Sequence, residues 1–433
     1  MLTCDHSVSS DRYDDRVEEH LHFTGFYHAS QIGIVQCQKA LVYTLVKRWH
    51  PDTHTFHLLI GECAVTLEDV AMILGLPMDG LPVTRMTISS VEALEAECLH
   101  QFGAAPRMSE CRGSGIKLTW LRDLKERLQL TDEENKQRHV KCHIILLLDT
   151  ILLGDKSGSS VHWKFLPLLR DFGSIAQFSW GSACLAHLYR ALCRASRFDY
   201  PILLINKAIL GGATGSFVWV AYSVDRVDPD IIPADIYMHS VVWSATVPLV
   251  SFECIEWHAT DRCRRQFGFV QGVPHQERNL DKAHGEVLTD PKNLNWATAT
   301  SHSFWVMQWT NMYNHVLTED DGPQHPLDIY MHWYRKKYGN CLNLSDLVVQ
   351  EDDEGDQGMD DVDQENEEAE EQEPNSLADP VFDLHNMQTH ADTESGPPGT
   401  HHSHISADEG QRHTPTHLAS YALQRPHFAC RSN

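Results

Sequence analysis

The hydrophobic pattern is clearest over residues 49–84, where it predicts a strand, a turn and a short helix. Apolar side chains recur at every second position, at Phe56, Leu58 and Ile60, as is typical of a strand. The strand is expected to turn at Gly61-Glu62. Every local signal in this segment agrees, so we predict a unit that folds reliably.

The helix that follows has both a start and a stop signal. Thr66 can cap its first turn while Asp69 reaches back to the backbone N–H of the cap. Gly75 and then Pro77 are expected to end it. A single apolar stripe runs along its length, made of Leu67, Val70, Ala71 and Leu74. Its repeated polar groups are caps and turn formers, which indicates packing rather than reactive chemistry.

The rest of the first half is predicted to be mainly helical. Ser30 is expected to cap a helix over residues 31–49. The apolar run at residues 144–153 indicates a core helix or strand, since Asp149 interrupts it and a membrane helix needs roughly 20 residues. Four more helices are expected, over residues 90–100, 120–130, 162–171 and 182–194.

The second half mixes strands and helices. Runs rich in β-branched and aromatic residues predict strands at residues 217–222, 241–243 and 250–255. A short helix over residues 261–267 should end at Gly268. Two aromatic helices follow, at residues 301–313 and at residues 327–338 before Gly339. The predicted fold is α+β, with a mainly helical first half, a mixed second half and a disordered acidic C-terminal tail.

Negative charge is concentrated in that tail. Residues 351–433 carry 20 acidic and 3 basic side chains, a net of −17 out of −25 for the chain. Residues 351–373 hold fourteen carboxylates and almost no large apolar residues, so they are predicted to be disordered. Two roles are open for this acidic segment. It either keeps the protein in solution or mimics nucleic acid by occupying a basic patch on a partner or on this protein. The run His401, His402 and His404 can chelate a metal weakly, although a solvated tail explains it equally well.

The cysteines and the N-terminal sequence bear on the cellular compartment. Twelve cysteines without a repeated spacing predict reduced thiols in an intracellular protein, several of them buried. The opening M-L-T-C-D-H-S has no basic region followed by an apolar run, so no secretory signal is expected.

Four further blocks accompany residues 49–84. They are S-V-H-W-K-F-L-P-L-L-R-D-F from Ser160, Y-M-H-S-V-V-W-S-A-T-V-P-L from Tyr237, F-E-C-I-E-W-H-A-T-D-R-C-R-R-Q-F-G from Phe252 and S-F-W-V-M-Q-W from Ser303. Together the five blocks resemble the plant mobile domain family, labelled "aminotransferase-like, plant mobile domain" and typified by the MAIN and MAIN-like meristem-maintenance proteins. The resemblance implies a nuclear protein in transcriptional regulation, transposable-element silencing, genome stability and meristem growth. It also implies nuclear protein partners, among them a protein-phosphatase-like one, and association with chromatin or DNA.

The resemblance also divides the chain. Between Arg197 and Phe217 the family normally carries a longer Trp-containing stretch and a basic segment, which this chain lacks. We therefore predict a protein less stable than a full-length relative, because lost core helices leave apolar faces uncovered. The expected parts are an N-terminal tail at 1–16, the first part of the domain at 17–197, a truncated junction at 198–216, the second part at 217–349 and the tail at 350–433.

The enzymatic alternatives each lack part of their motif. An aminotransferase needs a Schiff-base lysine with a phosphate cup, and none of Lys207, Lys282 and Lys292 is flanked by one. Gly154-Asp155 and Gly339-Asn340 are not followed by the histidines of metallophosphatase motifs, and residues 211–215 are not followed by the Gly-Lys-Ser/Thr of a phosphate loop.

Transposase chemistry requires three carboxylates converging on two metal ions. The candidates lie in or beside apolar segments, namely Asp149, Asp225, Asp228, Glu253 and Glu256. Cys254, His258 and Cys263 offer three zinc ligands without the usual paired spacing, so a packed thiol and an ordinary histidine are preferred. No catalytic, cofactor-binding or metal-binding residue is assigned, and no cofactor is expected.

Three short basic groups could contact phosphates if they share a face, although the ordered region as a whole is net negative. They are Arg194 with Arg197, Arg262 to Arg265, and Arg335 to Lys337. The favoured interpretation is a non-enzymatic nuclear interaction protein. The alternatives are a transposon-derived, DNA-binding or degenerate transposase-like protein, and a nonfunctional copy.

Overall fold

The computed structural model describes residues 2–3, 15–32, 36–37, 39–88, 90–153, 159–197, 218–223, 232–274, 295–296, 298–319 and 327–342. All of them fall in one unit, which includes Met1–Val348. This part of the chain is α+β, as predicted: helices dominate, and the strands form sheets of two or three. None of its helices has the length and apolar character needed to span a bilayer.

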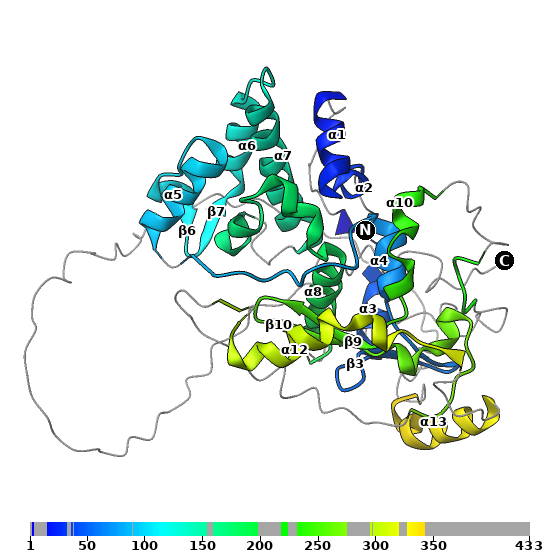
Figure 1. The fold of residues 1–433 in the computed structure, drawn as a ribbon. Helices are drawn as coiled ribbons and strands as arrows, with labels where there is room; N and C mark the ends of the chain where they lie inside the picture. Colours follow the sequence, from blue (N-terminus) through cyan, green and yellow to red (C-terminus); the bar gives the residue numbers. More distant parts are fainter. Residues whose placement is uncertain are drawn as a thin grey trace, which may run out of the picture. The chain divides into compact units, whose positions relative to one another are not determined.

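The first half is mostly helical (Figure 1). Its α-helices are α1 (Asp15–Thr24), α2 (Tyr27–Ser30), α3 (Lys39–Arg48), α4 (Leu67–Leu74), α5 (Val91–Phe102), α6 (Leu118–Arg127), α7 (Glu133–Leu147) and α8 (Trp180–Ala195). The strands β3 (Trp49–His50), β4 (Thr55–Leu58) and β5 (Gly61–Cys63) form an antiparallel sheet in that order. A two-stranded sheet pairs β1 (Leu2–Thr3) with β2 (Gln36–Cys37). A second three-stranded antiparallel sheet contains β6 (Cys111–Arg112), β7 (Gly115–Lys117) and β8 (Ser160–His162), in that order.

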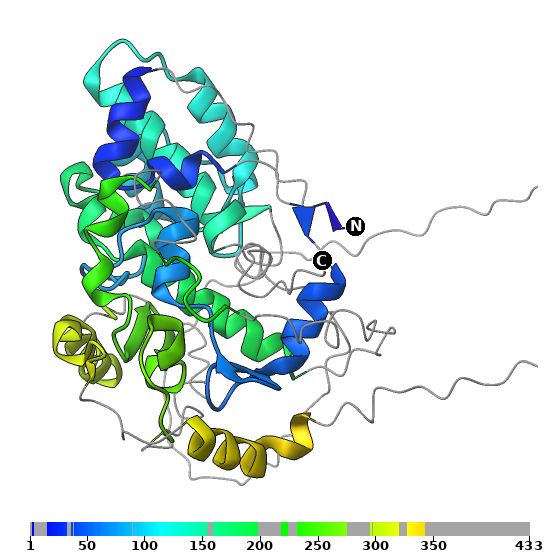
Figure 2. The same cartoon turned by 90° about the vertical axis from the view of Figure 1, so that its right-hand side faces the viewer.

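In the second half, β9 (Val247–Ser251) and β10 (Cys254–His258) form an antiparallel hairpin. The helices are α10 (Ala234–Tyr237), α12 (Thr300–Thr310) and α13 (Leu327–Leu342). Short 3₁₀ helices lie in both halves of the chain, at Met108–Glu110, Trp163–Leu168, Phe172–Gln177, Ser240–Val242, Thr260–Arg262, Arg264–Phe267 and Met312–His315. Figures 1 and 2 both show α13 beside β3–β5, where Tyr334 donates a hydrogen bond to the Leu58 carbonyl, 276 residues earlier.

The capped helix at residues 67–74 is confirmed in detail. The Thr66 hydroxyl accepts from the Asp69 N–H, and the Asp69 carboxylate accepts from the Thr66 N–H at 2.8 Å. Gly75 follows at φ +59, a left-handed conformation that glycine adopts at little cost. An added Cβ there would lie 2.5 Å from Cβ of His28, so the site requires glycine for space as well. The predicted stripe is buried.

Several predicted boundaries in the first half are wrong. The helix expected over residues 31–49 begins only at Lys39, and Ser30 belongs to α2, where its hydroxyl donates to the Tyr27 carbonyl. The turn expected at Gly61-Glu62 falls at residues 59–60 instead. The apolar run at 144–153 is confirmed as a core helix, since it is the buried end of α7 continued by a π-helical turn, Leu148–Leu152.

The second half needs more corrections. The strand predicted at residues 250–255 is a hairpin whose turn, Phe252 and Glu253, lies within the predicted strand. Residues 241–243 lie in and just after a 3₁₀ helix rather than in a strand, and residues 218–223 form loop and turn. Helix α13 continues through Gly339 to Leu342. The helical segment before Gly268 is confirmed as two 3₁₀ turns, with Gly268 at φ +80.

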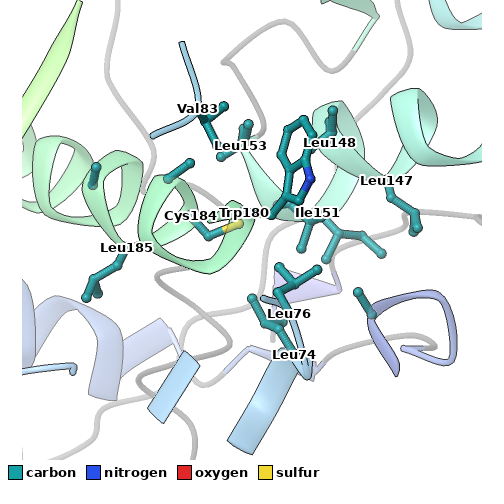
Figure 3. Close-up of a cluster of buried hydrophobic side chains, with 14 of the residues drawn as sticks. Leu74, Leu76, Val83, Leu147, Leu148, Ile151, Leu153, Trp180, Cys184 and Leu185 are labelled. Carbon is teal, nitrogen blue, oxygen red and sulfur yellow. The ribbon is translucent and has the colours of Figure 1, made fainter. Parts of the chain in front are cut away.

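Helix α8 lies at the centre of the core. It contacts α4 on one side and the β9–β10 hairpin on another. Its first residue, Trp180, is completely buried and lies among apolar side chains that include Leu76, Leu148 and Ile151 (Figure 3). Eight cysteines have side chains that the structure describes; all eight are free thiols and seven of them are buried, as the sequence predicts.

Candidate functional site

The structure joins residues 49–84 directly to the block around the β9–β10 hairpin, although some 200 residues separate them. The Gln266 side chain pairs with the backbone of Ala64, accepting its N–H at 2.7 Å and donating to its carbonyl at 2.9 Å. The two blocks place their titratable side chains against each other in two buried clusters. These clusters form the candidate functional site.

We call the first cluster the Glu256 centre; it comprises Trp49, His54, Arg190, Cys193 and Glu256. Because side chains alternate along a strand, Glu256 lies on the same side of β10 as Cys254 and His258. Its Oε1 accepts from Arg190 Nε at 2.7 Å, and its Oε2 lies 3.1 Å from His54 Nε2.

The remaining contacts of the Glu256 centre fix His54 and Cys193. His54 Nδ1 lies 3.0 Å from the carbonyl oxygen and 3.1 Å from the amide nitrogen of Trp257. Trp49 Nε1–H donates to Cys193 Sγ at 3.2 Å. Burial raises the pKa of the Cys193 thiol well above its usual range, and the nearby Glu256 carboxylate raises it further. His54 itself has a φ of +53, which is unusual outside glycine and marks a tightly determined turn.

We call the second cluster the Glu62 centre; it comprises Thr55, His57, Glu62, Arg262 and Tyr330. Glu62 Oε1 accepts from Arg262 Nε at 2.7 Å and from the Thr55 hydroxyl at 3.1 Å, and it lies 3.4 Å from His57 Nε2. Tyr330 places its hydroxyl 3.3 Å from Glu62 Oε2. Burial alone would raise the pKa of Glu62, but the His57 and Arg262 contacts outweigh it and lower that pKa.

Histidines beside these clusters are held neutral by burial. His50 stacks on His57 with ring centroids 3.8 Å apart, and burial followed by the His57 charge lowers the pKa of His50 to about 4. His258 Nδ1–H donates to the Ala245 carbonyl at 2.8 Å, and its Nε2 accepts from the first N–H of α4, at Leu67. Burial lowers the pKa of His258 to about 4 as well.

The structure separates the three residues weighed as a zinc site. Cys254 lies beside Glu256, His258 lies between Ala245 and Leu67, and Cys263 Sγ contacts the Ala259 carbonyl. The structure instead brings together three other potential metal ligands. Within the described part of the chain, His54, Cys193 and Glu256 have ligand atoms within 4.8 Å of one another.

The carboxylates weighed for transposase chemistry are likewise apart. Glu256 pairs with Arg190, and Glu253 pairs with Lys164 at 2.7 Å. Burial would raise the pKa of Glu253, but the Lys164 ammonium lowers it to about 2. Asp149 is buried in the π-helical turn. The other residues weighed for chemistry lie outside the described residues: Asp225, Asp228, Lys207, Lys282, Lys292, Gly154-Asp155 and residues 211–215.

The basic groups divide into two kinds. Arg262 and Arg264 are buried, and Arg264 donates to the carbonyls of Val270 and Thr318. Arg265 is partly buried and donates to the Ile60 carbonyl. The other two groups are exposed, Arg194 with Arg197 at the end of α8 and Arg335 to Lys337 on α13.

Sequence reasoning missed both clusters because their members are close only after folding. Arg262 and Glu62 are 200 residues apart, and His54 and Trp257 are 203 apart. One usable signal was present. Titratable side chains interrupt strands that are otherwise apolar, and β10 is buried at all five positions. A charged side chain in such a strand requires a buried partner.

The sequence is similar to known proteins over most of its length. The family model described as "Plant mobile domain" matches residues 25–213 and 205–335. A protein of Arabidopsis thaliana named "Serine/threonine-protein phosphatase 7 long form homolog" is 30% identical over 402 residues, covering 77% of this chain and 30% of that protein. "Protein MAIN-LIKE 2" of the same plant is 28% identical over 376 residues, covering 74% of this chain and 55% of that protein.

A third Arabidopsis thaliana relative, "Protein MAIN-LIKE 1", is 28% identical over 361 residues, covering 72% of this chain and 69% of that protein. The chain thus spans less than two thirds of the length of the phosphatase-named relative and of MAIN-LIKE 2. No solved structure matches it.

Proposed function

This chain belongs to the plant mobile domain family, and from that membership we propose that it is a non-enzymatic nuclear protein whose domain recruits protein or chromatin partners. The proposed roles are transcriptional regulation, silencing of transposable elements, genome stability and meristem growth. The mechanism we propose is recognition by the surface of a rigid α+β domain rather than chemistry within it.

One observation supports the proposal most directly: the titratable side chains of residues 49–84 and of the hairpin block bond to one another in the interior. Glu62, His54 and Glu256 are each less than 2% exposed. General acid–base or nucleophilic catalysis requires a group within reach of a substrate. Side chains that are buried and already paired instead stabilise the contact between the two blocks. This favours a structural role for these residues over a catalytic one.

One relative has a protein phosphatase in its name, which suggests a class of partner for this chain. That protein is more than three times as long as its matched segment, since the match covers 30% of it. We therefore propose that the domain works alongside a protein-phosphatase-like partner and does not itself hydrolyse phosphoesters. The purified chain should not hydrolyse p-nitrophenyl phosphate above the buffer rate, and turnover by the purified chain would contradict the proposal.

The decisive experiment is proximity labelling in plant nuclei with the full chain, run beside MAIN-LIKE 1 as the reference relative. We expect nuclear residence and chromatin or phosphatase partners shared with the reference. A chain that remains outside the nucleus, or that labels none of the reference's partners, would contradict recruitment and favour a nonfunctional copy.

A second candidate function, nucleic-acid binding by a transposon-derived protein, is supported by the two exposed basic groups. Arg194 with Arg197 and Arg335 to Lys337 are turned to solvent, where they can reach phosphates. Single-strand binding proteins also stack bases on exposed aromatic side chains. Tyr330 and Tyr334 do not supply such a surface, since both are buried.

A further inference from the structure

The Glu256 centre contains an arrangement that the scaffold role alone does not require. His54, Cys193 and Glu256 come from the β3–β4 turn, α8 and β10, and their ligand atoms lie within 4.8 Å of one another. All three side chains are buried. An imidazole, a thiol and a carboxylate at this separation form the mixed donor set that suits Zn²⁺ among the divalent metals. We propose that these three residues bind a zinc ion that ties the two family blocks to α8.

The outer contacts hold each of the three donors in place. A metal-binding histidine normally donates its second ring N–H to a backbone carbonyl, and His54 Nδ1 lies 3.0 Å from the Trp257 carbonyl. That tautomer turns the lone pair of Nε2 toward Glu256 Oε2, 3.1 Å away. Two acceptors at that distance repel each other unless a proton or a cation lies between or beside them.

Hydrogen bonds also position the Cys193 thiol and the Glu256 carboxylate. Trp49 Nε1–H points at Cys193 Sγ, where a donated hydrogen bond stabilises a thiolate more than a thiol. Arg190 contacts Oε1 of Glu256 and so leaves the Oε2 side facing His54. Binding releases the Cys193 proton to solvent, and the thiolate, carboxylate and imidazole then occupy three positions of a tetrahedral ion.

The competing arrangement needs no metal. His54 Nε2–H then donates to Glu256, Nδ1 accepts from the Trp257 N–H, and Cys193 keeps its proton. The two arrangements differ in the state of the sulfur, which a spectroscopic probe can detect directly.

The test uses the full chain produced in cobalt- or zinc-supplemented medium, because a buried site is filled as the domain folds. We expect at least one equivalent of metal by elemental analysis and, in the cobalt form, a near-ultraviolet thiolate-to-cobalt charge-transfer band. Histidines of the C-terminal run His401, His402 and His404 can also take up metal, but they give no such band because they contain no sulfur.

Two variants locate the sulfur. Cys193→Ser should lose the band, whereas Cys184→Ser should keep it, since Cys184 is also buried on α8 but nine residues earlier, on the opposite side of the helix. His54→Gln retains the thiol and should release the metal more readily to a chelator, which keeps the test informative if Cys193→Ser does not fold. Absence of the band in the folded wild-type protein, or a band that persists in Cys193→Ser, overturns the proposal.

Discussion

Arg262 Nε lies 2.7 Å from Glu62 Oε1, across 200 residues of sequence, and both side chains are buried. The pair connects the middle of β5 to the 3₁₀ segment after β10, so it holds the two family blocks together. Removing one partner of a buried ion pair leaves an uncompensated charge, which costs far more than the pair contributes when intact.

We therefore expect Arg262→Ala to lower the free energy of unfolding by about 3–5 kcal/mol, measured by urea denaturation. The control is Arg335→Ala, an exposed arginine on α13, which should change it by less than about 0.5 kcal/mol. The double variant Glu62→Gln with Arg262→Met should recover part of that stability, because no charge remains buried. Equal effects of Arg262→Ala and Arg335→Ala would contradict this role for the pair.

The capping box of α4 gives a second stability prediction. Thr66→Ala removes the hydroxyl that accepts from the Asp69 N–H and donates to Asp69 Oδ2 at 2.9 Å. We expect the free energy of unfolding to fall by about 1 kcal/mol, seen as a lower urea midpoint with an unchanged slope. Thr66→Ser keeps the hydroxyl and should be much less destabilised. If serine and alanine were equally destabilising, the effect would come from the methyl group rather than from the cap.

How far the sequence predicts the structure depends on how local each signal is. Helix α4 was predicted to the residue because its cap, stripe and terminating glycine all lie between Thr66 and Pro77. The β9–β10 hairpin was missed because its turn has no glycine, proline or asparagine. Phe252 occupies the left-handed position at φ +49, where a bulky side chain is seldom found.

The candidate site could not be predicted from the sequence for a different reason. In β4 the side chains of Phe56 and His57 point to opposite faces of the strand, yet both are buried because α13 covers the outer side of the sheet. Tyr330 and Tyr338 of α13 reach His57 and Glu62 across that surface. Which helix covers which strand depends on tertiary packing, and no spacing along the chain records it.

Burial of neutral histidines predicts sensitivity to acid. The folded-state pKa of His258 is about 4, below its ordinary value of 6.5, so the unfolded chain binds the proton more tightly in that window. The stabilising contribution is present above pH 6.5 and is lost as the pH falls toward 4. For this one residue the decrease in the free energy of unfolding between pH 7 and pH 5 is roughly 2 kcal/mol.

The measurement is the free energy of unfolding as a function of pH for wild type and His258→Gln. We expect the variant to be less stable at pH 7, because a neutral bond to the first turn of α4 is disturbed, and to lose roughly 2 kcal/mol less on acidification. His332→Gln, an exposed position on α13, should follow the wild-type profile. A parallel decline in wild type and His258→Gln would assign acid sensitivity to the other buried histidines.

The exposed basic residues of α13 provide the test for the nucleic-acid alternative. If Arg335, Lys336 and Lys337 bind phosphates, replacing all three by alanine should weaken DNA binding. The slope of log affinity against log salt should then fall by about 1 for each phosphate that is no longer neutralised. The matched control replaces three exposed cations near β6 and β7, Arg107, Arg112 and Lys117, and should leave the slope unchanged. Affinity that is independent of salt in the wild-type protein would contradict phosphate binding and leave recruitment through protein partners as the function this surface serves.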